Sequence, residues 1–176
     1  MNISDTSIQF QTNVTPDSIT EQLFGVQWDG YTESNIVVPE FPVSYSIGLI
    51  VGPSGTGKST LLSTLGDSNI PRWNLDQAIC SHYPSADVAA EQLSAVGLNS
   101  LPVWMKPYSV LSTGEKFRAE MSRQLVGGAV VDEFTSVIDR TVAKSCAYAI
   151  RRYVQRKGLQ QITFASCHYD IVEWLQ

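Results

Sequence analysis

Residues 52–59 read GPSGTGKS, and this stretch decides the fold. It fits the pattern G-x-x-x-x-G-K-[ST], in which glycines let the backbone curl until several N–H groups point at one anion. The apolar run at 45–51 before it predicts a buried strand, and residues 58–65 after it predict a helix. This order suits phosphate binding, because the helix turns its positive N-terminal end toward the anion.

The glycine loop predicts a nucleotide phosphate site. Lys58 is expected to reach the β- and γ-phosphates, and the Ser59 hydroxyl is expected to ligate Mg²⁺. A plain glycine turn is the alternative, but it leaves the position between a strand and a helix unexplained. The residues expected to line the phosphates are Gly52, Pro53, Ser54, Gly55, Thr56, Gly57, Lys58, Ser59 and Thr60.

A second polar site is predicted at the end of another strand. The segment AVVDE at 129–133 ends in two adjacent carboxylates. Alternation along a strand sends neighbouring side chains in different directions, so the two acids can have different roles. Asp132 suits the Mg²⁺ shell, and Glu133 suits a base that polarises an attacking water. Many strands end in acids, so this motif gains its weight from the glycine loop upstream.

Strands and helices alternate after the glycine loop, which indicates an α/β fold with a mostly parallel sheet covered by helices on both faces. We expect a single domain over 1–176, with an N-terminal antiparallel β part over about 1–44 and a reduced helical part over about 82–125. The further elements predicted are helices at 87–96, 113–125, 140–157 and 169–175, strands at 77–80, 129–131 and 161–165, and irregular connections at 65–76 and 97–108.

Composition and charge set broad limits on the class of protein. The chain has 176 residues, of which 43% are hydrophobic and 16% charged, so a core is available and wholesale disorder is excluded. No apolar run approaches the ~18 residues of a membrane span. The N-terminal residues lack the features of a secretory signal. Three widely spaced cysteines, at 80, 146 and 167, indicate reduced thiols and a cytoplasmic protein.

Further motifs in order resemble those of the ATP-binding cassette (ABC) ATPase family. LSTGE at 111–115 resembles the LSGGQ signature, and the helix after it bears two arginines. The acids at 132–133 come next, and SVID at 136–139 resembles the SALD loop. His168 follows the strand QITFASC, where the family places its switch histidine. With the glycine loop, five motifs occur in the family's order over roughly residues 30–176.

The resemblance implies an ABC-type P-loop ATPase that binds ATP and Mg²⁺ and hydrolyses ATP in a head-to-tail dimer. Each ATP lies between the glycine loop of one copy and the signature of the other. The resemblance implies that Ser112 and the Gly114 amide bind the γ-phosphate in trans and that His168 contacts it in cis. It also implies that Asp139 lies across the dimer seam.

Some of these residues have a second interpretation. Tyr31 lies where the family has an aromatic residue that stacks on adenine, but Trp28 and Phe41 are rivals, and packing is an equal alternative. Ser112 is also predicted as a helix N-cap, with Glu115 three residues later completing a capping box. The capping role is compatible with nucleotide contact.

The chain departs from the family between Lys58 and Ser112. The stretch is short, and 87–96 is the one predicted helix of the insertion that docks transporter members on a membrane subunit, so a soluble ATPase is expected. The family's Mg²⁺-ligating glutamine is missing there, and His82 is a candidate substitute. The chain also resembles a soluble subgroup in which some members are joined to an acetyltransferase-like domain.

Three functions stay open. The first is an ATPase whose ATP-driven dimerisation switches a protein partner, such as an acetyltransferase-like domain. The second is a P-loop kinase that phosphorylates a nucleotide, a DNA base or a small molecule. The third is a DNA-associated repair or maintenance ATPase. Its candidate phosphate contacts are Lys144, Arg151, Arg152, Arg156 and Lys157.

Overall fold

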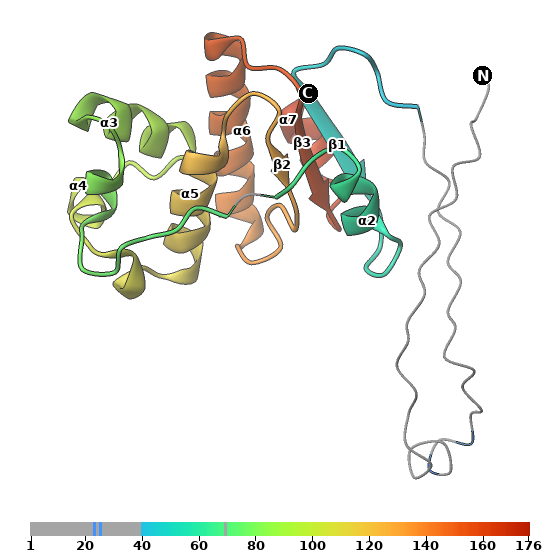
Figure 1. Ribbon diagram of the computed structural model, residues 1–176, viewed down its shortest axis with the longest axis horizontal. Helices are drawn as coiled ribbons and strands as arrows, with labels where there is room; N and C mark the ends of the chain where they lie inside the picture. The colour runs from blue at the N-terminus through green and yellow to red at the C-terminus, as the bar shows by residue number, and fades with distance from the viewer. Residues whose placement is uncertain (1–22, 24, 26–39, 69) are drawn as a thin grey trace. The chain divides into compact units, whose positions relative to one another are not determined.

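The computed structural model describes residues 23, 25, 40–68 and 70–176 (Figure 1). Contacts divide the chain into two units, Met1–Pro42 and Val43–Gln176, and the fold described below is that of the second. The predicted β part at about 1–44 lies almost wholly outside the described residues. That part and the single domain over 1–176 therefore stay predictions.

The described sheet has three parallel strands, β1 (Ile47–Val51), β2 (Val130–Val131) and β3 (Ile162–Ser166). Their order is β1-β3-β2, so the strand that comes last in the sequence is the central one. Every residue of β3 is buried, as expected for a parallel strand with neighbours on both sides. The predicted parallel sheet is confirmed for these strands.

Helices follow the strands in the predicted alternation. They are α2 (Lys58–Ser63), α3 (Ala86–Ala95), α4 (Leu101–Trp104), α5 (Thr113–Gln124), α6 (Arg140–Lys157) and α7 (Ile171–Leu175), with short 3₁₀ helices η1 (Ile79–His82) and η2 (Tyr108–Val110). Figure 1 shows α3 and α4 gathered away from the sheet, beyond α5 and α6. Helix α3 packs against both α5 and α6, and the predicted reduced helical part over about 82–125 stays a prediction.

Both faces of the sheet are covered, because side chains of β3 alternate between two clusters. Ile162 and Phe164 belong to the main core, which includes Ile150 of α6. Ala165 belongs to a smaller cluster with Leu62 of α2. A strand sends successive side chains to opposite faces, so α6 and α2 lie on different sides of the sheet.

Two local predictions are wrong. Residues 77–80 were expected to form a strand, but Ile79 begins a 3₁₀ helix, and Ala78 makes only an isolated antiparallel bridge to Pro107. Proline has no N–H group, so this bridge does not extend into a ladder. The connection at 97–108 was expected to be irregular, but it contains α4, with Pro102 in its first turn, where its missing N–H costs nothing.

Candidate active site

The glycine loop joins the carboxyl end of β1 to the start of α2. Gly55 and Gly57 have φ of 80° and 81°, a region that glycine reaches without strain. The Gly52 N–H donates to the carbonyl of Ser166 at 3.3 Å, and the Leu61 N–H donates to the Gly57 carbonyl at 2.9 Å. The predicted strand, loop and helix are therefore present in that order, and residues 53–56 of the loop are exposed.

Lys58 lies back over the glycine loop. Its Nζ donates to the Pro53 carbonyl at 2.8 Å, and the Thr56 hydroxyl donates to the same oxygen at 2.8 Å. A carbonyl oxygen is a neutral acceptor, and a phosphate oxygen would form a stronger, charge-assisted hydrogen bond with the ammonium. Ser59 is exposed and Thr60 half-buried at the start of α2. Lys58 is thus held at the loop by the Pro53 carbonyl, an acceptor that a phosphate oxygen can replace.

The two acids follow β2 in an unusual backbone conformation. Asp132 is half-buried and Glu133 is exposed. The Glu133 N–H donates to Oδ1 of Asp132 at 2.8 Å. Glu133 and Thr135 have φ of 51° and 67°, which side-chain-bearing residues rarely adopt. Such residues cost on the order of 1–3 kcal/mol each and persist only where surrounding contacts hold them.

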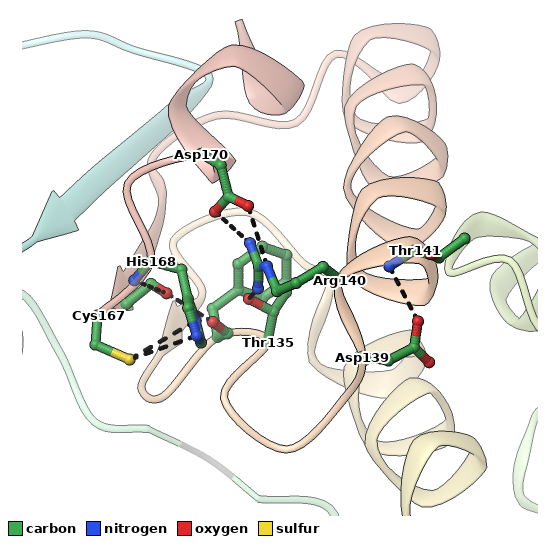
Figure 2. A network of polar contacts seen from close by, with 9 residues as sticks. Thr135, Asp139, Arg140, Thr141, Cys167, His168 and Asp170 are labelled. Carbon is green, nitrogen blue, oxygen red and sulfur yellow. Dashed lines mark hydrogen bonds and ion pairs between the residues drawn. The ribbon is translucent and has the colours of Figure 1, made fainter.

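His168 follows β3 and is half-buried. Its backbone N–H donates to the Ser166 hydroxyl at 3.2 Å, and its Nδ1 lies 3.7 Å from the Cys167 sulfur (Figure 2). Parallel strands point their carboxyl ends to one edge of a sheet, and ligands of α/β proteins bind at that edge. The predicted loop, acids and histidine are therefore brought to the same edge.

The signature segment forms the predicted capping box at the start of α5. Oε2 of Glu115 accepts from both the N–H and the hydroxyl of Ser112 at 2.8 Å, and the Glu115 N–H donates back to that hydroxyl at 3.4 Å. These bonds from Ser112 hold the pKa of Glu115 below its ordinary value. Gly114 lies close to the side chain of Ile138, since an added Cβ would be 3.6 Å from it.

Asp139 is the N-cap of α6, where its Oδ1 accepts from the Thr141 and Val142 N–H groups at 3.0 Å each. The next residue is Arg140, whose guanidinium forms a two-pronged ion pair with Asp170, with Nε 3.0 Å from Oδ2 (Figure 2). Asp170 lies two residues beyond His168, so this ion pair joins the Asp139 segment to the histidine segment.

The contacts of Arg140 were not predicted from the sequence. Besides the ion pair, its Nη1 donates to the hydroxyl of buried Thr135 at 3.3 Å, and its guanidinium lies 4.8 Å from the centre of the Trp174 ring. Ser166, which bonds both Gly52 and His168, was also missed. Neither residue belongs to a recognised motif. The available signal was position, because each is adjacent or nearly adjacent to a motif residue.

His82, the candidate substitute for the missing glutamine, bonds within its own segment, and its role at the site stays a prediction. Its Nε2 accepts from the Asn74 N–H at 2.9 Å, and its Nδ1 lies 3.1 Å from the Ala78 carbonyl. The ring also meets Trp73 edge-on. Both ring nitrogens are therefore occupied within the same short segment.

The basic residues of α6 are partly neutralised. Glu91 of α3 pairs with Lys157 at 2.8 Å and with Arg156 at 3.3 Å. The hydrogen bond from Lys157 is the main reason that the pKa of Glu91 is lowered. Arg152 and Arg156 line a hollow between α3 and α6 together with Asp87 and Glu91. This alternation of charge is less suited to DNA phosphates than an unbroken basic face.

The oxygen donors near the loop fit Mg²⁺. The Ser59 hydroxyl and the Asp132 carboxylate are the oxygen ligands that Mg²⁺ prefers, and this ion commonly takes its other ligands from water and substrate phosphates. Within residues 40–68 and 70–176, no group of three or more His, Cys, Asp or Glu is placed to hold a metal ion. Ser59 and Asp132 thus have the donor chemistry that Mg²⁺ takes.

Three aromatic residues were considered as the one that stacks on adenine, and only Phe41 is among the described residues. Stacking by Tyr31 therefore stays a prediction.

In the part of the chain that the structure describes, no helix has the length and apolar character needed to cross a membrane.

Comparisons with known proteins support the fold. No protein-family model matches the chain, and no curated protein matches it. A solved structure of similar fold is the dimeric post-hydrolysis state of the ATP-binding cassette MJ0796 bound to ADP and Pi. It has a TM-score of 0.55 and 15% sequence identity, and the match covers 82% of each chain. At this identity the likeness establishes a distant ABC-type P-loop fold.

Proposed function

We propose that this chain binds ATP with Mg²⁺ and hydrolyses it to ADP and phosphate. One observation carries the proposal: the glycine loop, the acids after β2 and His168 meet at the carboxyl edge of one parallel sheet. The likeness in fold to an ATP-binding cassette bound to ADP and Pi supports it.

The proposed roles follow from the chemistry of each group. The loop amides and Lys58 hold the β- and γ-phosphates, and Ser59 and Asp132 hold Mg²⁺, which neutralises phosphate charge. The exposed carboxylate of Glu133 takes a proton from the attacking water as it adds to the γ-phosphate. His168 contacts the γ-phosphate and keeps that water in line.

The proposal extends to a head-to-tail dimer in which each ATP is held by two copies. Ser112 and the Gly114 amide of one copy meet the γ-phosphate held by the other, and Asp139 lies at the seam. Two observations support this extension: Ser112 is exposed at the N-terminus of α5, and the MJ0796 structure is dimeric. A dimer that closes on ATP and opens after hydrolysis would switch a protein partner. The hollow between α3 and α6, with its charges of both signs, gives less support to a function in DNA binding.

Calorimetric titration with MgATP tests the binding site. Lys58→Ala is expected to weaken binding at least about 10-fold, because a charge-assisted hydrogen bond contributes roughly 1.5–3 kcal/mol. Lys144→Ala on α6 is the matched control, since it removes the same charge away from the loop, and it should bind as the wild type does. Equal affinity of both variants for MgATP would contradict the proposal that the glycine loop binds the nucleotide.

A kinase activity is the second candidate, and one feature favours it. A pocket of about 290 Å³ opens beside Asp132 and Glu133 and is also lined by Phe117, Met121 and Val137. Such a pocket could seat an acceptor molecule next to the acids. Labelled γ-phosphate that appears only as inorganic phosphate, with nucleotides and nucleosides offered as acceptors, would count against the kinase; transfer to an acceptor would favour it over the ATPase.

A further inference from the structure

Ser166 is the last residue of the central strand. It is 1% exposed and pairs in register with Val51, the last residue of β1. Because β3 lies between β1 and β2, the end of β3 adjoins the segments that leave both neighbours. Ser166 thus lies where the end of the central strand adjoins all three site segments.

Ser166 bonds to each of those segments. Its carbonyl accepts from the N–H of Gly52, the first residue of the glycine loop, at 3.3 Å. Its hydroxyl donates to the carbonyl of Phe134, directly after Glu133, at 2.9 Å. The same hydroxyl accepts from the N–H of His168 at 3.2 Å. The hydroxyl therefore links the acid segment to the histidine segment, and the carbonyl links both to the loop.

The bond to Phe134 supports a strained turn. Glu133 and Thr135, on either side of Phe134, both have positive φ. The peptide between them is held at both ends, since the Phe134 N–H donates to the Ala165 carbonyl at 2.8 Å and its carbonyl accepts from Ser166. Such strain relaxes when the contacts that impose it are removed. Loss of the Ser166 hydroxyl would leave the Phe134 carbonyl without this donor and so remove one of the contacts that hold the turn at Glu133.

The same strand provides an internal comparison. Thr163 is also 1% exposed, and its hydroxyl forms a hydrogen bond of 2.7 Å with the hydroxyl of Tyr45. Tyr45 precedes β1 and lies at the opposite end of the sheet from the glycine loop. Two buried, hydrogen-bonded hydroxyls on one strand thus differ in whether their partners belong to the site.

We propose that Ser166 is a positioning residue that sets Glu133 and His168 relative to the phosphate loop. This inference rests on the proposed ATPase function. The hydroxyl is buried, and it acts through the Phe134 carbonyl and the His168 N–H. Its removal should therefore change the rate of the chemical step more than the affinity for ATP, because small misplacements of reacting groups cost large factors in rate.

The test compares Ser166→Ala with Thr163→Val in the full chain, by steady-state phosphate release from MgATP and by urea unfolding. Both variants should lose similar stability, since each removes one buried hydroxyl. S166A should lower kcat roughly 10-fold or more with KM within about 3-fold, while T163V should stay within about 2-fold of the wild type in both. In a Glu133→Gln background, S166A should lower the residual rate much less, because both changes act on the same step.

If S166A fails to fold, Ser166→Cys carries the comparison, because a thiol keeps the volume and is a weaker hydrogen-bond donor. Its kcat should then fall below that of T163V. Equal kcat for T163V and the Ser166 variant that folds would overturn the positioning role alone. A wild-type protein that releases no phosphate from MgATP would instead overturn the ATPase proposal, and the role of Ser166 with it.

Discussion

At the scale of single residues, Glu115 occupies the groups that the proposed dimer assigns to a phosphate. Its carboxylate accepts from the N–H and the hydroxyl of Ser112 at 2.8 Å each. A helix N-terminus attracts anions, and here the anion is supplied by the chain itself. For a γ-phosphate to bind Ser112, the carboxylate must give up these donors or share them against its own charge.

Glu115→Gln should therefore strengthen ATP-dependent dimerisation. Glutamine keeps an oxygen that can accept from Ser112, but it removes the negative charge. In a Glu133→Gln background with MgATP, we expect the dimer dissociation constant to fall by roughly 2- to 5-fold, the equivalent of the 0.3–1 kcal/mol typical of one charge at a helix end. Sedimentation velocity measures this change, with Glu173→Gln on α7 as the control. An unchanged or weaker dimer would contradict the competition.

The same residue predicts a pH dependence of stability. Because the pKa of Glu115 in the folded chain lies below its ordinary value of 4.5, its charged form stabilises folding above that pH. This contribution is lost as the pH falls through the lowered folded value. Urea unfolding should find the E115Q variant less stable than the wild type at pH 7. The loss should be at most about 1 kcal/mol, because solvent screens the half-buried carboxylate. A difference that does not shrink as the pH is lowered below 4.5 would rule out this origin.

At the scale of elements, Arg140 ties the start of α6 to α7. Its ion pair with Asp170 is partly exposed, with side-chain exposures of 37% and 45%, so the pair alone contributes little. Arg140 also donates to the buried hydroxyl of Thr135 and stacks on Trp174, and these contacts do not involve Asp170. Removing the Arg140 side chain should therefore cost more stability than removing the Asp170 side chain.

Arg140→Ala should accordingly destabilise the fold more than Asp170→Ala. We expect R140A to lower the free energy of unfolding by about 1–3 kcal/mol, because the change removes a donor from a buried hydroxyl and also removes a cation–π contact. We expect D170A to lower the free energy of unfolding by less than about 1 kcal/mol, because water can solvate the partly exposed guanidinium. Urea unfolding of the two variants measures this; equal losses would show that the ion pair carries the whole interaction.

Some local sequence signals were enough to predict a strand or a helix, and others were not. The strand over Ile47–Val51 was predictable because an apolar run stops at a glycine and a proline, and α6 because helical spacing ends at Gly158. The segment at Gln77 was mistaken for a strand because its fate depends on Pro107, thirty residues away in the sequence. Short apolar runs are decided by tertiary partners that local pattern does not reveal.

The candidate site was predictable in its motif residues and not in its supporting contacts. Glycines before a lysine and acids after an apolar strand each have a chemical reason to occur in that pattern. The link through Ser166 depends on β3 lying between β1 and β2, a strand order that no local pattern encodes. The spacing predicts the capping box, but the sequence does not reveal that the Glu115 carboxylate accepts hydrogen bonds from both the N–H and the hydroxyl of Ser112.

At the scale of the whole molecule, one sheet edge collects chemistry from three distant parts of the chain. The segments after β1, β2 and β3 supply a glycine loop, a carboxylate pair and an imidazole, and hydrogen bonds to and from Ser166 join them. Helix α5 carries its exposed capping serine on the same unit. The division of labour that we propose follows: one edge binds and hydrolyses ATP, and the start of α5 serves a second copy.

The most direct test of the central claim is phosphate release from MgATP by the wild type and by Glu133→Gln, with ATP binding measured on the same preparations. The account predicts that E133Q binds MgATP as the wild type does but releases phosphate at least about 100-fold more slowly, the usual contribution of a general base. Full turnover by E133Q, or a wild type that binds MgATP and never releases phosphate, would contradict it.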